Sequence, residues 1–577
     1  MRTMIAAMTT PRGMASALLA CIWMLTAVLA QPRVTTGVLD IFSALYIDQQ
    51  DPACSGIHIE TDYVYITPKL DTEENPAWSE VISGSNIIGD GSDGGFNIRT
   101  GDFVEVVYAA NTSRVTGRRM LLSDQPAVLD FQIIQPGSPK EVFTGDPIQV
   151  SSYIYVINTC GWPQSTTTDK LRQLYFTGSQ NIQDYHSTCS YNKVFFPEAN
   201  TRIFDNINVP CSGTVQSGVL KYNYDSSNSC GAAEQFAWRM AGEDLARSLG
   251  YGPEMDSTQR RRLVVVLPTS VKCGWAGLGS VGCSGRSCSV YIKGGYANSL
   301  LVHMHELGHT QGLSHAGRGL DEYGDKSDIM GTAGSSPGYL CMNAGNQLRV
   351  GWNAPLATLT PPLADFSIVG RLLDGTRTEP GRWELPAAAG TDTNHLLLDF
   401  NSRGGQAFPN AFLSFRARGS GFDSILSADM NNKVLVHFFN GSASERDYNR
   451  TLLVGVLGAG QAFTSPFLNP AGGVKQYGGG WKVTVIWIQN GKSALIQMCR
   501  MYAPEVAKAA PTTAPAAEAA PPTPSWSAHL GAACSGCRNG SAASYEVQRH
   551  GLPCRQRNGG LPPPQLHQRK GIPRAFM

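Results

Sequence analysis

The chain has 577 residues, of which 42% are hydrophobic and 16% are charged, a balance typical of globular proteins. This length exceeds what one hydrophobic core serves, so we expect two or three domains. The formal net charge of +1 gives no electrostatic reason for binding to nucleic acid or to an anionic membrane, and we predict neither partner. Composition leaves the oligomeric state open.

The N-terminus, residues 1–30, has the pattern of a secretory signal peptide. Arg2 and Arg12 precede an apolar run, and Val28 and Ala30 stand at positions −3 and −1 of a cleavage site. The alternative is an uncleaved anchor, because the apolar run of seventeen residues just reaches the length of a membrane-spanning helix. We favour cleavage, since no basic stop-transfer cluster follows the run. The mature protein is therefore predicted to be secreted and free of the membrane.

Residues 31–147 form a first region with short strand-like runs at 102–110 and 127–135, separated by Gly, Asp and Ser turns. The dibasic pair Arg118-Arg119 is a candidate processing site, and the alternative interpretation is a solvated loop. The sequence does not locate the N-terminus of the mature protein.

Residues 148–353 mix strand-like and helix-like patterns. The segments 151–158 and 262–268 have the composition of buried strands, whereas 288–294 alternates like a strand at the edge of a sheet. Between them, residues 234–250 predict an amphipathic helix. Its expected buried stripe is Phe236, Met240, Ala241 and Leu245.

The segment from His305 to His315 reads HELGHTQGLSH and is the most informative part of the chain. Histidines four residues apart on a helix share one face, so His305 and His309 can bind one metal ion. Glu306 then projects beside the ion, where its carboxylate can accept a proton from water. Gly312 permits the positive φ that ends the helix and returns His315 as a third ligand. Three protein ligands leave one coordination position open, as in catalytic zinc sites.

Zinc is the expected metal, because three imidazoles with an open fourth position suit it and peptide hydrolysis needs no redox change. Copper is the alternative, since histidine sites bind it well. His303 lies well around the same helix, and we expect a packing or surface histidine there. The acidic loop at 321–325 could hold calcium, but we favour a solvated turn.

HExxHxxGxxH is the signature of the metzincin zinc endopeptidases, which place a methionine turn beneath the metal. Met330 follows the third histidine by fifteen residues, a spacing that suits this turn. The chain also resembles the gametolysin family, the autolysin-type matrix metalloproteinases of volvocine green algae, over roughly residues 150–500. The segments that carry the resemblance are CGW at Cys160, CGWAGLGSVGCSGRSC from Cys273, HELGHTQGLSHA from His305, NAGNQLRVGW up to Trp352 and NKVLVHFFNG from Asn432.

The resemblance implies an α+β fold with a metzincin-like catalytic domain over 148–353, built from a twisted mixed sheet and a zinc-binding helix. It implies a propeptide at 31–147, and Met330 packed beneath the metal ligands. It further implies that the protein substrates are Pro- and Hyp-rich glycoproteins of a cell wall or extracellular matrix. In some metzincins a tyrosine just behind the methionine assists the oxyanion; here the next tyrosine is Tyr339, and we assign it no role.

Cysteine usage agrees with export. The chain has 14 cysteines, and one lies within the predicted signal peptide, which leaves thirteen. Most should form disulfide bonds in an oxidising compartment, although their spacing does not fix the pairing. The odd number raises the hypothesis that Cys54 binds the metal and keeps a zymogen inactive, but we favour an ordinary structural cysteine. Sequons at Asn111, Asn440, Asn449 and Asn539 predict a glycoprotein.

Residues 354–502 change to short alternating runs, which predict an all-β, sandwich-like accessory domain. The runs are HLLLDF, AFLSFRA, KVLVHFF, TLLVGVL and KVTVIWI. This domain binds glycoprotein or carbohydrate, or packs against the protease and stabilises it, and we favour the second role. Residues 503–577 combine a Pro/Ala-rich linker with a tail whose composition predicts disorder.

Together these features predict a secreted zinc endopeptidase that acts on proteins. The alternative is a matrix-binding or structural glycoprotein that keeps a metal site without useful turnover, and the presence of Glu306 argues against it. The predicted edge strand at 288–294 could pair with an extended polypeptide and hold its scissile carbonyl over the metal.

Overall fold

The structure is a computed structural model. It describes residues 33–45, 63–68, 80–82, 100–108, 128–137, 141–217, 220–258, 260–283, 287–331, 340–360, 369–400, 409–419, 422–441, 449–466 and 480–501. The predicted signal peptide, Cys54, the pair Arg118-Arg119, Tyr339 and the tail from 503 lie outside these residues, so those predictions stay predictions. Among the described residues, no helix has both the length and the apolar character needed to cross a membrane.

A ten-stranded sheet forms the centre of the first half of the chain. Four of its strands run parallel to one another in the order β9-β7-β12-β14, and β13 follows antiparallel to β14. Their bounds are β7 Ser152–Thr159, β9 Thr201–Val209, β12 Arg261–Val266, β13 Gly277–Ser280 and β14 Ser287–Ile292. All of β12 and nearly all of β7 are buried, which confirms the two predicted buried strands.

The predicted edge strand at 288–294 is wrong, because β14 lies inside the sheet. β12 pairs with one side of β14 and β13 with the other. The alternation of polar and apolar residues misled the prediction, since a small polar side chain can be buried when the backbone around it is paired. Ser289 is such a residue: it is 2% exposed, and its N–H donates to the hydroxyl of Ser280 at 3.0 Å.

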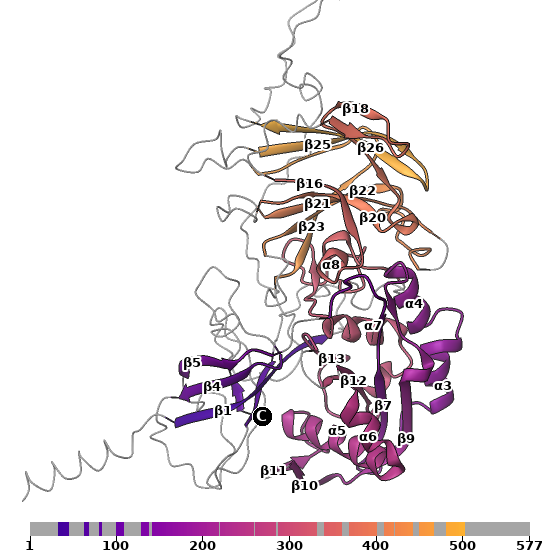
Figure 1. Cartoon of the computed structure of the whole chain (residues 1–577). Coiled ribbons are helices and arrows are strands. Elements are labelled where there is room, and N and C mark those ends of the chain that lie inside the picture. The colour runs from indigo at the N-terminus through magenta and orange to yellow at the C-terminus, as the bar shows by residue number, and fades with distance from the viewer. Residues whose placement is uncertain are drawn as a thin grey trace, which may run out of the picture.

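The outer edge of β13 is covered by a strand from the N-terminal region. β1, Arg33–Leu45, is long enough to pair with β4 and β2 along most of its length and with β13 at its C-terminal end. Figure 1 shows this strand running from the group around β4 and β5 to the body that contains β13. The other strands of this group are β2 Tyr63–Pro68, β3 Glu80–Ile82, β4 Phe103–Tyr108 and β5 Val128–Gln135. β4 and β5 confirm the strands predicted at 102–110 and 127–135.

Helices cover both faces of the parallel part of the sheet. Alternate side chains of β7 point to these opposite faces. Ile154 and Val156 join the core beneath α7, Leu300–His309, while Tyr153 and Tyr155 join the core beneath α5, Ala232–Ala246. The first core also receives α3 Thr168–Arg172 and α4 Ile182–Cys189, and the second receives α6 Gly252–Ser257.

The helix predicted over 234–250 exists, but its buried face is shifted from the predicted stripe. Phe236 is buried, whereas Met240 is only half-buried, and Trp238, Gly242 and Ala246 face the sheet instead. Gly242 determines this orientation, because a Cβ there would lie 2.3 Å from the ring of Tyr155.

The second half of the chain contains two sheets that share one hydrophobic core. The six-stranded sheet has the order β15-β23-β22-β21-β20-β16, and the four-stranded sheet has the order β19-β26-β25-β24. The bounds are β16 Ala354–Leu359, β19 Arg382–Pro386, β20 Thr393–Leu398, β21 Asn410–Arg416, β22 Lys433–Phe439, β23 Thr451–Leu457, β24 Ala462–Thr464, β25 Gly480–Gln489 and β26 Ser493–Met501. Each of the five predicted runs is a strand.

β15, Ala316–Gly317, connects the two halves of the protein. It follows His315 directly and pairs in parallel with the start of β23. The six-stranded sheet therefore begins within the loop that carries the third histidine of the motif, and Figure 1 shows the two halves stacked along the long axis of the molecule.

Candidate metal centre

The three histidines of the motif converge in the structure. α7 begins after Ser299, whose side chain accepts a hydrogen bond from Val302 N, and it carries His305 and His309. Gly312 has the expected positive φ of 82° and turns the chain back toward the helix. One ring nitrogen of each of His305, His309 and His315 lies within 4.8 Å of the others. Local helix spacing and one glycine therefore produce a cluster able to hold one ion.

Hydrogen bonds at Nδ1 fix the orientation of each ring. His305 Nδ1 lies 3.0 Å from Ile329 O, and His309 Nδ1 lies 2.8 Å from Leu313 O. A carbonyl only accepts, so in both rings Nδ1 carries the proton and Nε2 keeps its lone pair. His315 Nδ1 contacts the Glu322 carboxylate. A partner of this kind on the far ring nitrogen is the usual support of a metal-binding histidine.

Burial favours the neutral form of the His305 and His309 imidazoles, which is the form that binds metals. His305 and His309 are 0% exposed, and this burial lowers the pKa of both imidazoles well below the usual range. The neighbouring histidines lower both pKa values further. Among the described residues, Nε2 of His305 and Nε2 of His309 have no hydrogen-bond partner. Buried polar atoms in native proteins are nearly always satisfied, so the donor set fits a bound cation such as zinc.

Glu306 lies on the same helix and is completely buried. Burial raises the pKa of its carboxyl group well above the usual range, and neither carboxylate oxygen has a hydrogen-bond partner among the described residues. Two glycines of β13 make room for this side chain. A Cβ at Gly277 would lie 2.3 Å from Glu306 Oε1, and a Cβ at Gly279 would lie 3.0 Å from Oε2. β13 therefore passes directly against the carboxylate.

Met330 lies against α7, where the resemblance places it. Its sulfur would be 2.5 Å from a Cβ on Gly308, and the side chain is 0% exposed. Its N–H donates to Asp328 Oδ1 at 2.7 Å, which anchors the turn.

His303 is a packing residue and lies away from the ligand atoms of the cluster. It is 0% exposed, its Nε2 lies 3.1 Å from Ala297 O, and the Tyr175 hydroxyl lies 3.0 Å from its Nδ1. Nε2 therefore carries the proton and donates to the carbonyl, while Nδ1 accepts from the tyrosine.

The interpretation of 321–325 as a solvated turn is wrong. Glu322, Tyr323 and Asp325 are 1%, 5% and 0% exposed. Glu322 contacts His315, and the Tyr323 ring centroid lies 4.2 Å from that of His315. Sequence reasoning missed both residues because three acidic groups in a short loop resemble a solvated surface. Their position between the third histidine and Met330 was the signal that could have identified them.

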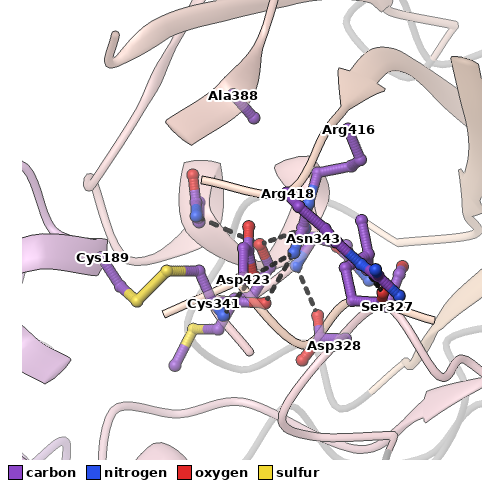
Figure 2. A network of polar contacts seen from close by, with 12 residues as sticks. Cys189, Ser327, Asp328, Cys341, Asn343, Ala388, Arg416, Arg418 and Asp423 are labelled. Atoms are coloured by element: carbon purple, nitrogen blue, oxygen red, sulfur yellow. Dashed lines mark hydrogen bonds and ion pairs between the residues drawn. A yellow bond between two sulfur atoms is a disulfide. The ribbon is translucent and has the colours of Figure 1, made fainter. Parts of the chain in front are cut away.

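A buried polar network fixes the loop after His315 against the second half of the chain (Figure 2). Asp328 accepts hydrogen bonds from Met330 N, Asn343 N and Asn346 Nδ2. Asn343 Nδ2 lies 2.8 Å from the hydroxyl of Thr451 in β23.

Two ion pairs extend this network. His437 Nε2 of β22 lies 3.0 Å from Asp325 Oδ2, with both side chains fully buried, and Arg416 pairs with Asp423 at 2.7 Å. Residues of the β-rich half therefore hold the segment that supplies Ile329 O and Met330.

Four disulfide bonds join pairs of described cysteines in and around the first half of the chain. The pairs are Cys160–Cys211, Cys189–Cys341, Cys230–Cys273 and Cys283–Cys288. Cys189–Cys341 links α4 to the segment just after the Met330 turn and lies beside the polar network in Figure 2. Cys499 is also disulfide-bonded. The prediction that most cysteines are paired is confirmed for the described ones named here.

Comparison with known proteins agrees with this site. Residues 149–470 match the sequence model of a family described as gametolysin peptidase M11. The chain belongs to this family. It is also 30% identical over 442 residues to the protein named Autolysin of Chlamydomonas reinhardtii, with 64% of this chain and 68% of that protein covered. The resemblance seen in the sequence is thereby confirmed, and the gametolysin family assignment makes the chain a metallopeptidase that acts on proteins.

Proposed function

We propose that this gametolysin-family chain is a zinc endopeptidase with His305, His309 and His315 as metal ligands and Glu306 as general base. The observation that carries the proposal is the convergence of three buried imidazoles beside a buried carboxylate that has no hydrogen-bond partner in the described part of the chain. A zinc ion bound there would polarise the scissile carbonyl and make water acidic enough to deprotonate near neutral pH.

Glu306 performs the proton transfers in this mechanism. One carboxylate oxygen accepts a proton from the attacking water while the water oxygen bonds to the carbonyl carbon. The same oxygen then delivers that proton to the amide nitrogen as the C–N bond breaks, so the carboxylate returns to its starting state.

We further propose a secreted enzyme whose substrates are Pro- and Hyp-rich glycoproteins of a cell wall or extracellular matrix. The similarity to a protein named Autolysin and the four sequence-predicted sequons support this substrate class and location. In this proposal residues 31–147 are a propeptide, 148–353 the metzincin-like peptidase domain, and 354–502 a β-sandwich domain. The pairing of β15 with β23 and the His437–Asp325 contact support a stabilising role for the sandwich.

The decisive experiment compares processed wild-type protein with Glu306→Gln on casein and on a Pro-rich wall glycoprotein, with and without a chelator. Zinc content is measured in each sample. We expect one zinc per chain in both proteins, and a loss of at least about 10³-fold in cleavage rate in the variant. Glu243→Gln is the matched control and should cleave normally, because Glu243 belongs to α5, which covers the face of the sheet opposite to α7.

Equal cleavage by Glu306→Gln would remove the proposed base. Absence of cleavage by a zinc-loaded, processed wild-type sample would instead favour the matrix-binding glycoprotein. Cleavage that survives full removal of the metal would exclude the proposed role of the histidines.

A further inference from the structure

The candidate centre is closed in the full chain. His305, Glu306, His309 and His315 are each 0% exposed. An endopeptidase must admit an extended polypeptide to such a centre, so the segment that covers it occupies space that substrate needs.

The C-terminal end of β1 lies against this centre, because β1 contacts α7 and Ala44 accepts a hydrogen bond from Tyr323. It runs antiparallel along β13, with Phe42, Ser43, Ala44 and Leu45 opposite Ser280, Gly279, Leu278 and Gly277. Backbone hydrogen bonds secure both ends of the pairing: Val281 N donates to Ile41 O, and Ala276 N donates to Leu45 O, each at 2.7 Å. Thr100 reinforces the first end, because its hydroxyl accepts from Ile41 N and donates to Val281 O.

The register places two β1 side chains on the face of the sheet that carries α7. Gly277 and Gly279 lie on this face, since a Cβ at either position would meet Glu306. Residues directly opposite each other in an antiparallel pair share a face. Leu45 and Ser43 therefore lie on the same face as α7, and both are buried. Ser43 Oγ has no hydrogen-bond partner among the described residues.

Tyr323 makes a direct contact with this strand. Its ring packs against His315 with centroids 4.2 Å apart, and its hydroxyl donates to the main-chain carbonyl of Ala44 at 2.9 Å. The Tyr323 hydroxyl lies beside a metal-binding histidine and bonds to the backbone of an extended strand. This contact does not depend on the side chains of that strand. The same contact is available to any polypeptide that takes the place of β1.

We propose that Tyr323 binds a backbone carbonyl of polypeptide substrates laid along β13, and that residues 41–45 of β1 occupy this position as an internal inhibitor in the full chain. This inference rests on the proposed function, since it names the substrate position of the same site. Removal of β1 opens the edge of β13 and breaks the hydrogen bond between the Tyr323 hydroxyl and Ala44 O. The inhibition acts through strand pairing and does not require Cys54.

Binding of a peptide with the sequence of residues 39–45, LDIFSAL, tests the occupied position. Its affinity for processed Glu306→Gln protein is measured by fluorescence anisotropy, and a peptide of the same residues in scrambled order is the control. We expect saturable binding by the native order and competitive inhibition of the active enzyme. Tyr323→Phe should weaken peptide binding about tenfold, the effect of one lost hydrogen bond.

Tyr323→Phe should also lower kcat/KM for protein substrates about tenfold in the processed enzyme. Its thermal stability should stay normal. Tyr155→Phe is the matched control, because it removes a buried hydroxyl that has no hydrogen-bond partner among the described residues. Unchanged peptide affinity and unchanged kcat/KM in Tyr323→Phe would overturn the inference. Leu45→Asp in the uncut chain should raise basal cleavage, whereas Leu45→Ile should not.

The two proposals fail in different ways. If processed wild-type protein cleaves substrates but ignores the peptide, the inhibitor assignment is lost and the peptidase mechanism stands. If the peptide binds in a Tyr323-dependent way but zinc-loaded protein cleaves nothing, the binding position stands and the peptidase mechanism is lost.

Discussion

At the scale of single residues, the partner of each metal-binding ring matters as much as the ring. His305 and His309 are oriented by main-chain carbonyls, which no substitution removes, whereas His315 is oriented by the side chain of Glu322. His315 is also the ligand farthest from the rigid helix, since it lies beyond Gly312. Its ring orientation therefore depends on a residue that can be tested by mutation.

We predict that Glu322→Ala lowers zinc affinity about 10- to 100-fold, because His315 loses the acceptor that orients its ring and increases its basicity. Glu322→Gln keeps an acceptor oxygen and should lose less. Competition with a chromogenic chelator measures the affinity. Glu379→Gln, an exposed residue in an ion pair with Arg382, serves as the control. Wild-type affinity in Glu322→Ala would show that the carboxylate does not support the ligand.

The ligands and the base could be predicted from sequence, whereas their supporting residues could not. Helical spacing fixes where His305, Glu306 and His309 point, so the motif determines their geometry locally. The contacts of Glu322 and Tyr323 depend on how the loop returns to α7, and this return is decided by the Met330 turn and by strands far along the chain. Spacing alone cannot report such a path.

At the scale of elements, β13 lies between β14 and β1 in the sheet and packs against α7. The CGWAGLGS segment places glycine at each position that faces Glu306, which brings the strand within contact of the carboxylate. The sequence did not reveal that GLGS pairs with the outer side of β14, because GLGS lacks the β-branched and aromatic residues that indicate strands. Glycine is tolerated in β13 because the strands on its two sides, β1 and β14, both pair with it.

We predict that Gly277→Ala lowers kcat by about 10²-fold, because the new Cβ, 2.3 Å from Oε1, must displace the Glu306 carboxylate. Zinc content should remain at the wild-type level, since no ligand is touched. Gly295→Ala is the control, because a Cβ there meets nothing within 4 Å. Steady-state kinetics and metal analysis give the result. A normal kcat in Gly277→Ala would contradict the assigned position of the base.

The contact between β22 and the Met330 turn leads to a prediction about stability. Burial alone would raise the pKa of Asp325, but His437 and the hydrogen bonds from Ser327 outweigh it and lower this pKa to about 2. His437→Ala leaves a buried carboxylate without its ion-pair partner. We expect the free energy of unfolding to fall by about 3–5 kcal/mol in urea titrations.

His395→Ala, in β20 of the same six-stranded sheet, is the matched control for the loss of an imidazole, because His395 forms no ion pair among the described residues. Its smaller loss of stability measures the cavity alone. Equal losses in the two variants would show that the ion pair with Asp325 contributes nothing.

At the scale of the whole molecule, the two halves form one unit around the metal loop. The five β-like runs after residue 354 were predicted correctly because alternation with period two reports a half-buried sheet. The strand β15 and the ion pair of His437 were not predictable, since both join residues more than a hundred positions apart. The path of β1 onto β13 is a similar long-range pairing, and the sequence showed no strand signal that we recognised at 33–45.

Buried histidines outside the metal site make the stability of the folded chain depend on pH. Burial, aided by the charge of Arg262, lowers the pKa of His186 to about 4, and burial lowers the pKa of His395 to about 3. Both pKa values are about 6.5 in an unfolded chain. Asp328 has the opposite effect on the pH dependence of stability, because burial and the charge of Asp325 raise its pKa to about 6.

A histidine with a depressed pKa in the folded state contributes fully above about pH 6.5 and loses its contribution as the pH falls toward 4, since the unfolded state then binds the extra proton. We predict that the free energy of unfolding of metal-free protein falls between pH 7 and pH 4. His186→Gln should reduce that fall by about 3 kcal/mol, the effect of a pKa shift from 6.5 to about 4. Urea titrations of both proteins at several pH values measure the two slopes. Parallel curves would mean that His186 is protonated in the folded chain, contrary to its burial beside Ile182 O and Phe196.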